Sequence, residues 1–248
     1  MTKVHAVLTP DLLDEYQREG VVRLPAAVAF RDVQAMAAAL RRKIEARPKP
    51  GPRPSQLSSR TGEFAGMANA TVRAVLNELL GEWEEPAHWG LPLVSFHTGQ
   101  SAWEVPHEHW HIDLGARPED PRLARLFLVL ASSRPGGGGT GYVAGSHRLI
   151  QAQMHAAGRP LPSAQARRAL AARSPWFSAL TSPPSGENRV RRFMQEGSEL
   201  DGVSVRVCEM LGEPGDVLLM HPLMLHAPTP NVLATPRMML AQFVYGCG

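Results

Sequence analysis

Two short segments, separated by almost half of the chain, contain the side chains of a metal centre. The first is His111-Ile112-Asp113, and the second ends at His226, which Arg237 follows eleven residues later. Two imidazoles and one carboxylate bind one face of a divalent metal and leave other positions open, as in non-haem Fe(II) oxygenases. An arginine near the second histidine could bind the carboxylate of an acidic cosubstrate. These residues predict an enzyme and a class of reaction.

A β-strand would aim the first two ligands, because residues two apart on a strand point to the same face. His111 and Asp113 would share such a face, with the residue between them turned into packing. On a strand that extends backwards, His107 and His109 join this face, and we expect them either to contact substrate at the mouth of the site or to lie on the surface. A jelly roll folds a late strand beside an early one and would bring His226 to the pair.

The elements that must position these residues change character at about residue 90. Periodicity and capping residues predict helices at residues 10–19, 30–46 and 70–83. Strands are predicted at residues 21–24, 93–96, 126–130, 140–144, 203–208, 216–220 and 238–245. We therefore expect a mainly β fold with flanking helices in a single domain, residues 1–248. Residues 91–248 would form a cupin-like double-stranded β-helix (jelly roll), with residues 1–90 as helical support.

One long segment between strands has its own composition. Residues 151–200 are rich in Arg, Ala, Ser and Pro, and they are too long for an ordinary connection. We expect this insert to be a lid or a substrate-facing wall, with helix near residues 164–172. Its Arg189, Arg191 and Arg192 are either a solvated basic face or a patch that attracts an anionic substrate.

Composition excludes several classes of protein. The 248 residues are 44% hydrophobic and 20% charged, which suits a globular domain rather than a disordered chain. A net charge of +3 with few aromatic residues disfavours nucleic-acid binding. Cys208 and Cys247 form no C-x-x-C pair, so we expect no zinc ribbon or disulfide framework, and a reducing cytoplasm as the location. We find no signal peptide and no apolar run near the roughly 20 residues that cross a bilayer, so no membrane partner is expected.

In order and spacing, these segments resemble the phytanoyl-CoA dioxygenase-like family of Fe(II)/2-oxoglutarate-dependent oxygenases. The resemblance spans nearly the whole chain, and its C-terminal part is the series His226, Asn231 and Arg237, at intervals of five and eleven residues from the histidine. It implies that His111, Asp113 and His226 bind Fe(II). It further implies that Arg237 binds the distal carboxylate of the cosubstrate 2-oxoglutarate, and that O2 takes the remaining coordination position.

The chain departs from the family pattern near the cosubstrate. Pro228 stands where the family often has a small hydroxyl residue, so that contact is either absent or supplied by Thr229. Thr140, on a predicted strand after a glycine turn, could also donate to the cosubstrate. Asp113 distinguishes the chain from related halogenases, which have a small residue there. It implies hydroxylation or another oxidation, such as desaturation or ring formation.

Several other polar residues are predicted to be structural. We expect His147 at the start of a helix that Ser146 caps, and His221 on the opposite face from His226. Trp110 should pack behind the site, and Asn231 should fix the turn that follows His226.

Three functional hypotheses follow. The first is an oxidoreductase, most simply a hydroxylase, that acts on a small organic molecule, either anionic or from secondary metabolism. The second is a cupin-like metalloenzyme without 2-oxoglutarate, using His109, His111 and a distant acid, although Glu119 is not at the expected cupin spacing. The third is a non-catalytic ligand-binding jelly roll. Arg237 separates the first from the others, because only the first needs a cosubstrate clamp.

Overall fold

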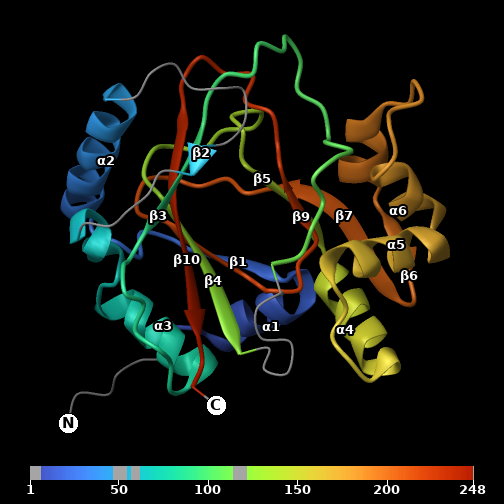
Figure 1. The fold of residues 1–248 in the computed structure, drawn as a ribbon, viewed down its shortest axis with the longest axis horizontal. Coiled ribbons are helices and arrows are strands. Elements are labelled where there is room, and N and C mark those ends of the chain that lie inside the picture. The colour runs from blue at the N-terminus through green and yellow to red at the C-terminus, as the bar shows by residue number, and fades with distance from the viewer. Residues whose placement is uncertain (1–6, 47–54, 57–61, 114–121, 248) are drawn as a thin grey trace.

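The computed structural model describes residues 7–46, 55–56, 62–113 and 122–247. Two antiparallel sheets form the centre of this part of the chain (Figure 1). Residues of both sheets line a cavity. The larger sheet has the strand order β1 (Val21–Leu24), β8 (Val217–Met220), β4 (Leu123–Val129), β10 (Arg237–Tyr245), β3 (Leu91–Ser95) and β2 (Ser55–Gln56). The smaller sheet has the order β6 (Ser198–Leu200), β7 (Val203–Glu209), β5 (Thr140–Ala144) and β9 (His226–Pro228). The predicted jelly roll, mainly β with flanking helices, is confirmed.

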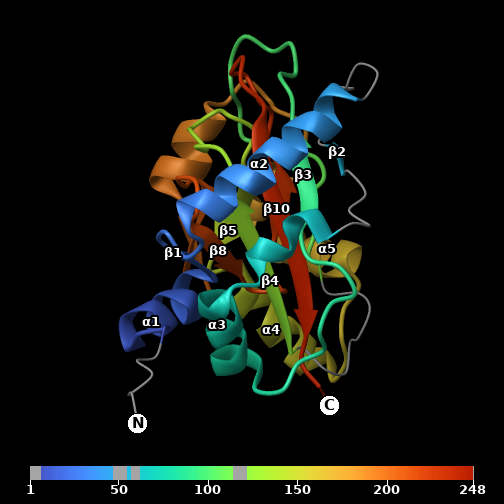
Figure 2. The ribbon, with the colours of Figure 1, turned by 90° about the vertical axis from the view of Figure 1, so that its left-hand side faces the viewer.

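Helices cover the outside of the larger sheet and lie beside the smaller one (Figure 1, Figure 2). Those before the jelly roll are α1 (Pro10–Glu19), α2 (Phe30–Glu45), the 3-10 helix η1 (Gly62–Met67) and α3 (Ala70–Leu80). Those after β5 are α4 (Ser146–Ala157), α5 (Ser163–Arg173), α6 (Pro175–Leu180) and the π-helical turn η2 (Arg191–Glu196). The helix expected near residues 164–172 is therefore α5, within an insert that is itself largely helical.

Capping residues set the ends of the N-terminal helices. Thr9 caps α1, where its side chain accepts a hydrogen bond from the Leu12 amide at 3.4 Å, and Gly20 ends the helix with φ 79°. The third helix ends at Leu80 rather than at residue 83, because Gly81 takes φ 68° and leaves the helical conformation. The sequence predicts the starts of these helices better than their ends.

Strand β4 separates the hydrophobic core from the cavity. Leu126 and Leu128 face outward and are buried with the apolar residues of α2 and α3. Arg125 and Phe127 point the other way and line the cavity. One central strand thus supplies both the packing that holds the helices and part of the wall of the site.

No helix among the described residues is long and apolar enough to cross a membrane. The proline-rich stretch at residues 47–54 and Glu119 lie outside the described residues.

Candidate metal centre

Backbone pairing brings the two distant histidines together. The amide of His111 donates to the carbonyl of His226 at 2.9 Å, and the amide of His226 donates back to the carbonyl of His111 at 2.9 Å. The two imidazole rings lie 4.1 Å apart, and the ligand atoms of His111, Asp113 and His226 all lie within 4.8 Å of one another. The three side chains that the sequence predicts as metal ligands therefore form one cluster.

Backbone carbonyls fix the tautomer of both histidines. Nδ1 of His111 lies 2.7 Å from the carbonyl oxygen of His109, and Nδ1 of His226 lies 2.9 Å from that of Met224. A carbonyl oxygen only accepts, so each Nδ1 carries the proton and each Nε2 presents a lone pair. Burial lowers the pKa of His226 to about 4, which keeps this imidazole neutral at physiological pH. Such carbonyl-oriented neutral imidazoles are typical of metal ligands.

The carboxylate of Asp113 completes the cluster. Its Oδ1 lies 3.8 Å from Nε2 of His111 and its Oδ2 lies 3.6 Å from Nε2 of His226. Oδ2 is buried without a hydrogen-bond partner among the described residues. A carboxylate whose two oxygens face two imidazole lone pairs fits a divalent cation.

The segment that carries His111 and Asp113 is not the regular strand that the sequence predicts. His109 has φ 64°, which breaks the two-residue alternation, and the single bridge between His111 and His226 is the ladder contact of this segment within the described part of the chain. His109 still lines the cavity, whereas His107 lies in a separate surface hollow. The expectation that all four residues share one strand face is therefore wrong.

The insert supplies the backbone bonds that a strand partner would have made. The amide of Ile112 donates to Oγ of Ser163 at 3.0 Å, and Nη1 of Arg167 donates to the carbonyl of Trp110 at 2.9 Å. The acceptor Ser163 and the donor Arg167 both belong to α5. The irregular metal-binding segment is thus held in place by a helix more than fifty residues further along the chain.

The three arginines of the insert that the sequence singles out lie outside the cavity. Arg189 is buried, and its guanidinium donates to four backbone carbonyls, those of Val105, Pro106, Ala179 and Leu180. Arg191 pairs with Glu196 at 2.7 Å, and Arg192 pairs with Glu187. None of the three lines the cavity, and Arg189 holds the backbone just before the metal-binding segment.

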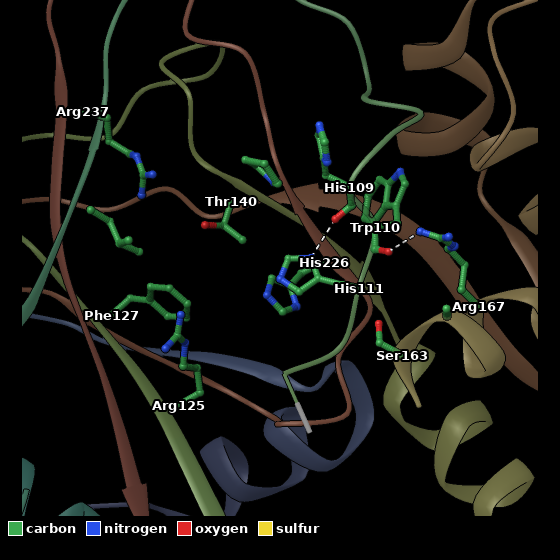
Figure 3. A pocket seen from close by; sticks show the side chains of 13 residues that line it. His109, Trp110, His111, Arg125, Phe127, Thr140, Ser163, Arg167, His226 and Arg237 are labelled. Carbon is green, nitrogen blue, oxygen red and sulfur yellow. Dashed lines mark hydrogen bonds between the residues drawn. The ribbon is translucent and has the colours of Figure 1, made fainter. Parts of the chain in front are cut away.

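Arg237 is a buried cation at the other end of the cavity (Figure 3). It is 5% exposed, and its guanidinium donates to Oγ of Ser95 at 3.0 Å and contacts the sulfur of Met239 at 2.9 Å. Its Nε has no partner among the described residues. Burial lowers the pKa of Arg237 to about 10, and the charge of nearby Glu209 opposes this shift. A buried guanidinium with neutral partners is suited to receive a carboxylate.

The turn after the C-terminal histidine holds the serine that contacts Arg237. Asn231 is fully buried and donates to the carbonyls of Ser95 at 2.9 Å and Thr235 at 3.0 Å, so the predicted turn-forming role is confirmed. Gly138, at φ 77°, packs here so closely that a Cβ would lie 2.7 Å from Cβ of Asn231. The glycine turn therefore allows three segments to meet behind the arginine.

Thr140 is the hydroxyl residue of the smaller sheet that lines the cavity. It lines the cavity from β5, and Figure 3 shows its hydroxyl directed towards the side where Arg237 lies. Thr229, the alternative donor, does not line the cavity, because its hydroxyl lies 3.0 Å from the Gly139 carbonyl and 3.1 Å from Oε1 of Glu209. Pro228 does line the cavity but offers no hydroxyl.

The cavity has a volume of about 640 Å³ and lies between the two sheets and α5. Its walls combine apolar and cationic side chains, and the described lining residues are Leu93, His109, Trp110, His111, Arg125, Phe127, Thr140, Ser163, Ala164, Arg167, His226, Pro228 and Arg237. Trp110 is 1% exposed and packs at the wall as predicted. Arg125, Ser163 and Arg167 were not predicted. Arg125 could have been noticed in the sequence, because it is a charged residue directly before the apolar run at residues 126–130.

Of the remaining polar residues, His147 and His221 are structural as predicted, whereas Ser146 has a different role from the predicted one. His147 begins α4 and His221 packs against it, with rings 4.7 Å apart, so neither is near the metal cluster. Ser146 does not cap α4. Gly145 occupies the cap, and Oγ of Ser146 accepts from the Leu225 amide at 3.0 Å. Ser146 does not act as the cap because its buried hydroxyl is the acceptor for the buried amide of Leu225.

The sequence matches the model of the phytanoyl-CoA dioxygenase family over residues 16–239. The chain belongs to the phytanoyl-CoA dioxygenase family. Membership confirms the predicted resemblance and the class of enzyme, a non-haem iron oxygenase that uses 2-oxoglutarate. No curated protein is similar enough in sequence to count as a relative.

Solved structures share the fold of this family member at low sequence identity. HygX from Streptomyces hygroscopicus, with nickel and 2-oxoglutarate bound, is 15% identical with a TM-score of 0.58, covering 96% of this chain and 87% of HygX. The carbocyclase SnoK from nogalamycin biosynthesis is 15% identical with a TM-score of 0.57, covering 96% and 84%. The epimerase SnoN of the same biosynthesis is 15% identical with a TM-score of 0.52, covering 95% and 81%.

Proposed function

We propose that this enzyme hydroxylates a small organic molecule, with Fe(II) held by His111, Asp113 and His226 and with 2-oxoglutarate held by Arg237. One observation carries the proposal: a buried guanidinium lines the same cavity as the two histidines of the His-Asp-His cluster. A metal site alone would suit many cupin-like proteins. The cationic end of the cavity, at Arg237, is the feature that favours an acidic cosubstrate.

Arg237 is suited to the distal carboxylate of 2-oxoglutarate for electrostatic reasons. Its described hydrogen-bond partners are the uncharged Ser95 and Met239, so the buried positive charge is incompletely compensated. A carboxylate offers two acceptors to the planar guanidinium, and such a pair is strong in a buried site. We assign the hydroxyl of Thr140 as an additional donor to the same cosubstrate.

A bound ferrous ion supplies the activation of O2 that couples decarboxylation of 2-oxoglutarate to oxidation of a C–H bond. In a hydroxylation, one oxygen atom enters succinate and the other enters the product, with release of CO2. The chain's own contribution is to orient both reactants and to limit access of water. Asp113 occupies the position that a halogenase leaves small. SnoK and SnoN are a carbocyclase and an epimerase, so we infer that the placement of the substrate C–H bond selects the outcome.

The cavity favours a small, anionic substrate. Its volume of about 640 Å³ lies within the range of roughly 300–1,000 Å³ typical of small-molecule sites. The described lining includes three arginines, Arg125, Arg167 and Arg237, and no acidic residue. With Arg237 assigned to the cosubstrate and Arg125 paired with Asp113, the charge of Arg167 remains for a substrate carboxylate or phosphate. SnoK and SnoN act in nogalamycin biosynthesis, which supports a role in secondary metabolism.

The test is a comparison of Arg237→Met with Arg206→Met, an exposed arginine that pairs with Glu19 outside the cavity. Thermal unfolding is recorded with Ni2+, without and with 2-oxoglutarate. At about 100 times its Kd, 2-oxoglutarate should stabilise the Ni2+ form of the wild type and of Arg206→Met by about 2.7 kcal/mol. Arg237→Met should keep the Ni2+ response and lose the 2-oxoglutarate response.

Succinate formation with Fe(II), ascorbate and O2 then separates the hypotheses. Turnover of 2-oxoglutarate by the wild type supports the proposal. A protein that binds Ni2+ but shows neither 2-oxoglutarate-dependent stabilisation nor succinate formation would instead support the cupin-like alternative. A protein that binds no Ni2+ would support the non-catalytic one.

A further inference from the structure

Arg125 is a charged residue in an otherwise apolar strand, and the proposed function leaves its role open. It lies on β4 between Met220 of β8 and Phe243 of β10. The residue is 7% exposed, and its guanidinium packs 3.7 Å from the ring centroid of Phe243 and 4.8 Å from that of Phe127. An apolar side chain would fill this position without the desolvation that a buried guanidinium requires.

The described acidic group that meets this cation is Asp113. Nε of Arg125 lies 3.3 Å from Oδ2 of Asp113, with both side chains buried. Neither Nε nor Nη1 of Arg125 has a complete hydrogen bond among the described residues, and Oδ2 lacks one as well. Figure 3 shows the guanidinium beside the ring of Phe127, in the same cavity as the two histidines of the cluster. The Arg125–Asp113 pair is thus in ionic contact.

The two oxygens of Asp113 have different surroundings. Oδ2 lies 3.3 Å from Nε of Arg125 and 3.6 Å from Nε2 of His226, whereas Oδ1 lies 3.8 Å from Nε2 of His111 and contacts no arginine or lysine among the described residues. A guanidinium that holds one oxygen fixes the rotation of the carboxylate about its Cβ–Cγ bond. It also competes with a metal for that oxygen, so a single carboxylate oxygen is offered to the metal.

We infer that Arg125 is a positioning residue, which holds one oxygen of Asp113 so that the carboxylate binds the metal through the other and keeps the remaining coordination positions free. The inference rests on the proposed metal site. It assigns Arg125 no contact with a reacting atom. Its stacking on two aromatic rings gives the guanidinium a fixed orientation, as a positioning role requires.

The test measures Ni2+ affinity by calorimetry for the wild type, Arg125→Met and Arg125→Lys. Loss of a residue that orients a metal ligand typically weakens metal binding about 10-fold to 100-fold, and we expect a loss in this range for Arg125→Met. Arg125→Lys, which keeps the charge and one donor, should recover part of the loss. If Arg125→Met does not fold, a loss of affinity in Arg125→Lys supports the inference and unchanged affinity contradicts it.

Arg23→Met is the matched control. Arg23 lies on the edge strand β1 of the same sheet and pairs with the buried Asp216 at 3.5 Å, away from the cluster. Its replacement removes an arginine–aspartate pair from the same sheet, and Ni2+ affinity should stay within about 2-fold, as expected for independent sites.

A double-mutant cycle shows whether Arg125 acts through Asp113. In the Asp113→Asn background, Arg125→Met should change the Ni2+ affinity by less than about 3-fold, because the carboxylate that it orients is gone. An equal loss in both backgrounds, or wild-type affinity in folded Arg125→Met, would overturn the inference. Failure of the wild type itself to bind Ni2+ would instead contradict the proposed function, so the two failures are distinguishable.

Discussion

Two pairs of closely packed histidines occur among the described residues, and the pairs have different chemistry. The rings of His111 and His226 lie 4.1 Å apart, and those of His147 and His221 lie 4.7 Å apart. Both pairs join residues that are far apart in the sequence, and both include buried rings. Only the first pair has a carboxylate between its ring nitrogens and a cavity beside it, as Asp113 and the lining residues show.

Hydrogen bonding accounts for much of the difference. In the first pair, each Nδ1 donates to a backbone carbonyl, so two lone pairs remain for a ligand. In the second pair, Nδ1 of His221 accepts from the Leu223 amide at 3.1 Å, and Nε2 of His147 lies 3.0 Å from the carbonyl of Gln17. One lone pair is therefore already used, and no acid completes a cluster among the described residues. Proximity of imidazoles alone does not make a metal site; the tautomers and the third ligand decide.

Asp113→Asn should have the largest effect, because it makes the first pair resemble the second. An amide keeps the shape but loses the charge, so Ni2+ affinity should fall more than the roughly 10-fold to 100-fold that loss of an outer-shell partner costs. Hydroxylation should be abolished. Calorimetric titration with Ni2+ checks the affinity, and an affinity within 10-fold of the wild type would contradict the assignment of Asp113 as a ligand.

Replacing one histidine of each pair by phenylalanine should separate the pairs next most clearly. At about 100 times its Kd, Ni2+ should stabilise the wild type and His221→Phe by about 2.7 kcal/mol. His226→Phe should show no such stabilisation, because a lone pair of the cluster is lost. Thermal unfolding with and without Ni2+ measures this, and loss of the response in His221→Phe would mean that the second pair also binds metal.

The second pair should make the stability of the folded protein depend on pH in the acid range. Burial, assisted by the charge that His147 would carry, lowers the pKa of His221 from 6.5 to about 3. Between these values the unfolded chain binds one more proton than the folded protein, so stability falls as the pH falls through this window and is unaffected above it. This group should contribute about 1.4 kcal/mol per pH unit there. Urea unfolding of the metal-free protein at several pH values should show a correspondingly smaller slope for His221→Phe, and an identical slope would count against a buried neutral His221.

Ser163→Ala should have the smallest effect, and it concerns the support of the first pair. The variant removes the acceptor of the Ile112 amide, so stability should fall by about 1–3 kcal/mol if that amide stays buried. Ni2+ affinity should fall only a few-fold, because the bridge between His111 and His226 remains. Ser178→Ala, at a hydroxyl outside the cavity, serves as the control, and equal Ni2+ affinities for both variants and the wild type would limit Ser163 to a stabilising role.

The sequence was informative where the determinants are local. The caps at Thr9 and Gly20 define α1, and the glycine turn before Thr140 marks the start of β5. The ligand types and the series from His226 to Arg237 indicated the metal cluster and the family. Each of these features depends on residues within about one turn or on fixed spacing.

The sequence failed where the determinants are distant. The conformation of His111 depends on a bridge to a residue over a hundred positions away, and the amide of Ile112 depends on Ser163. Arg189 donates to backbone carbonyls that no local sequence pattern reveals. Arg125 is explained by its contact with Asp113, which is seen only in the structure. Alternation along a strand cannot anticipate such contacts, because they arise when separate segments pack.

The attachment of α5 to the metal-binding segment has a consequence for protein engineering. Ser163 and Arg167 serve both as cavity wall and as anchors of the backbone at Ile112 and Trp110. A chimaera that exchanges this helix to alter substrate preference would therefore disturb the iron ligands as well, unless the graft restores an acceptor and a donor at these two positions. Gradual replacement of residues between the anchors offers a safer route to new selectivity than transplanting the whole insert.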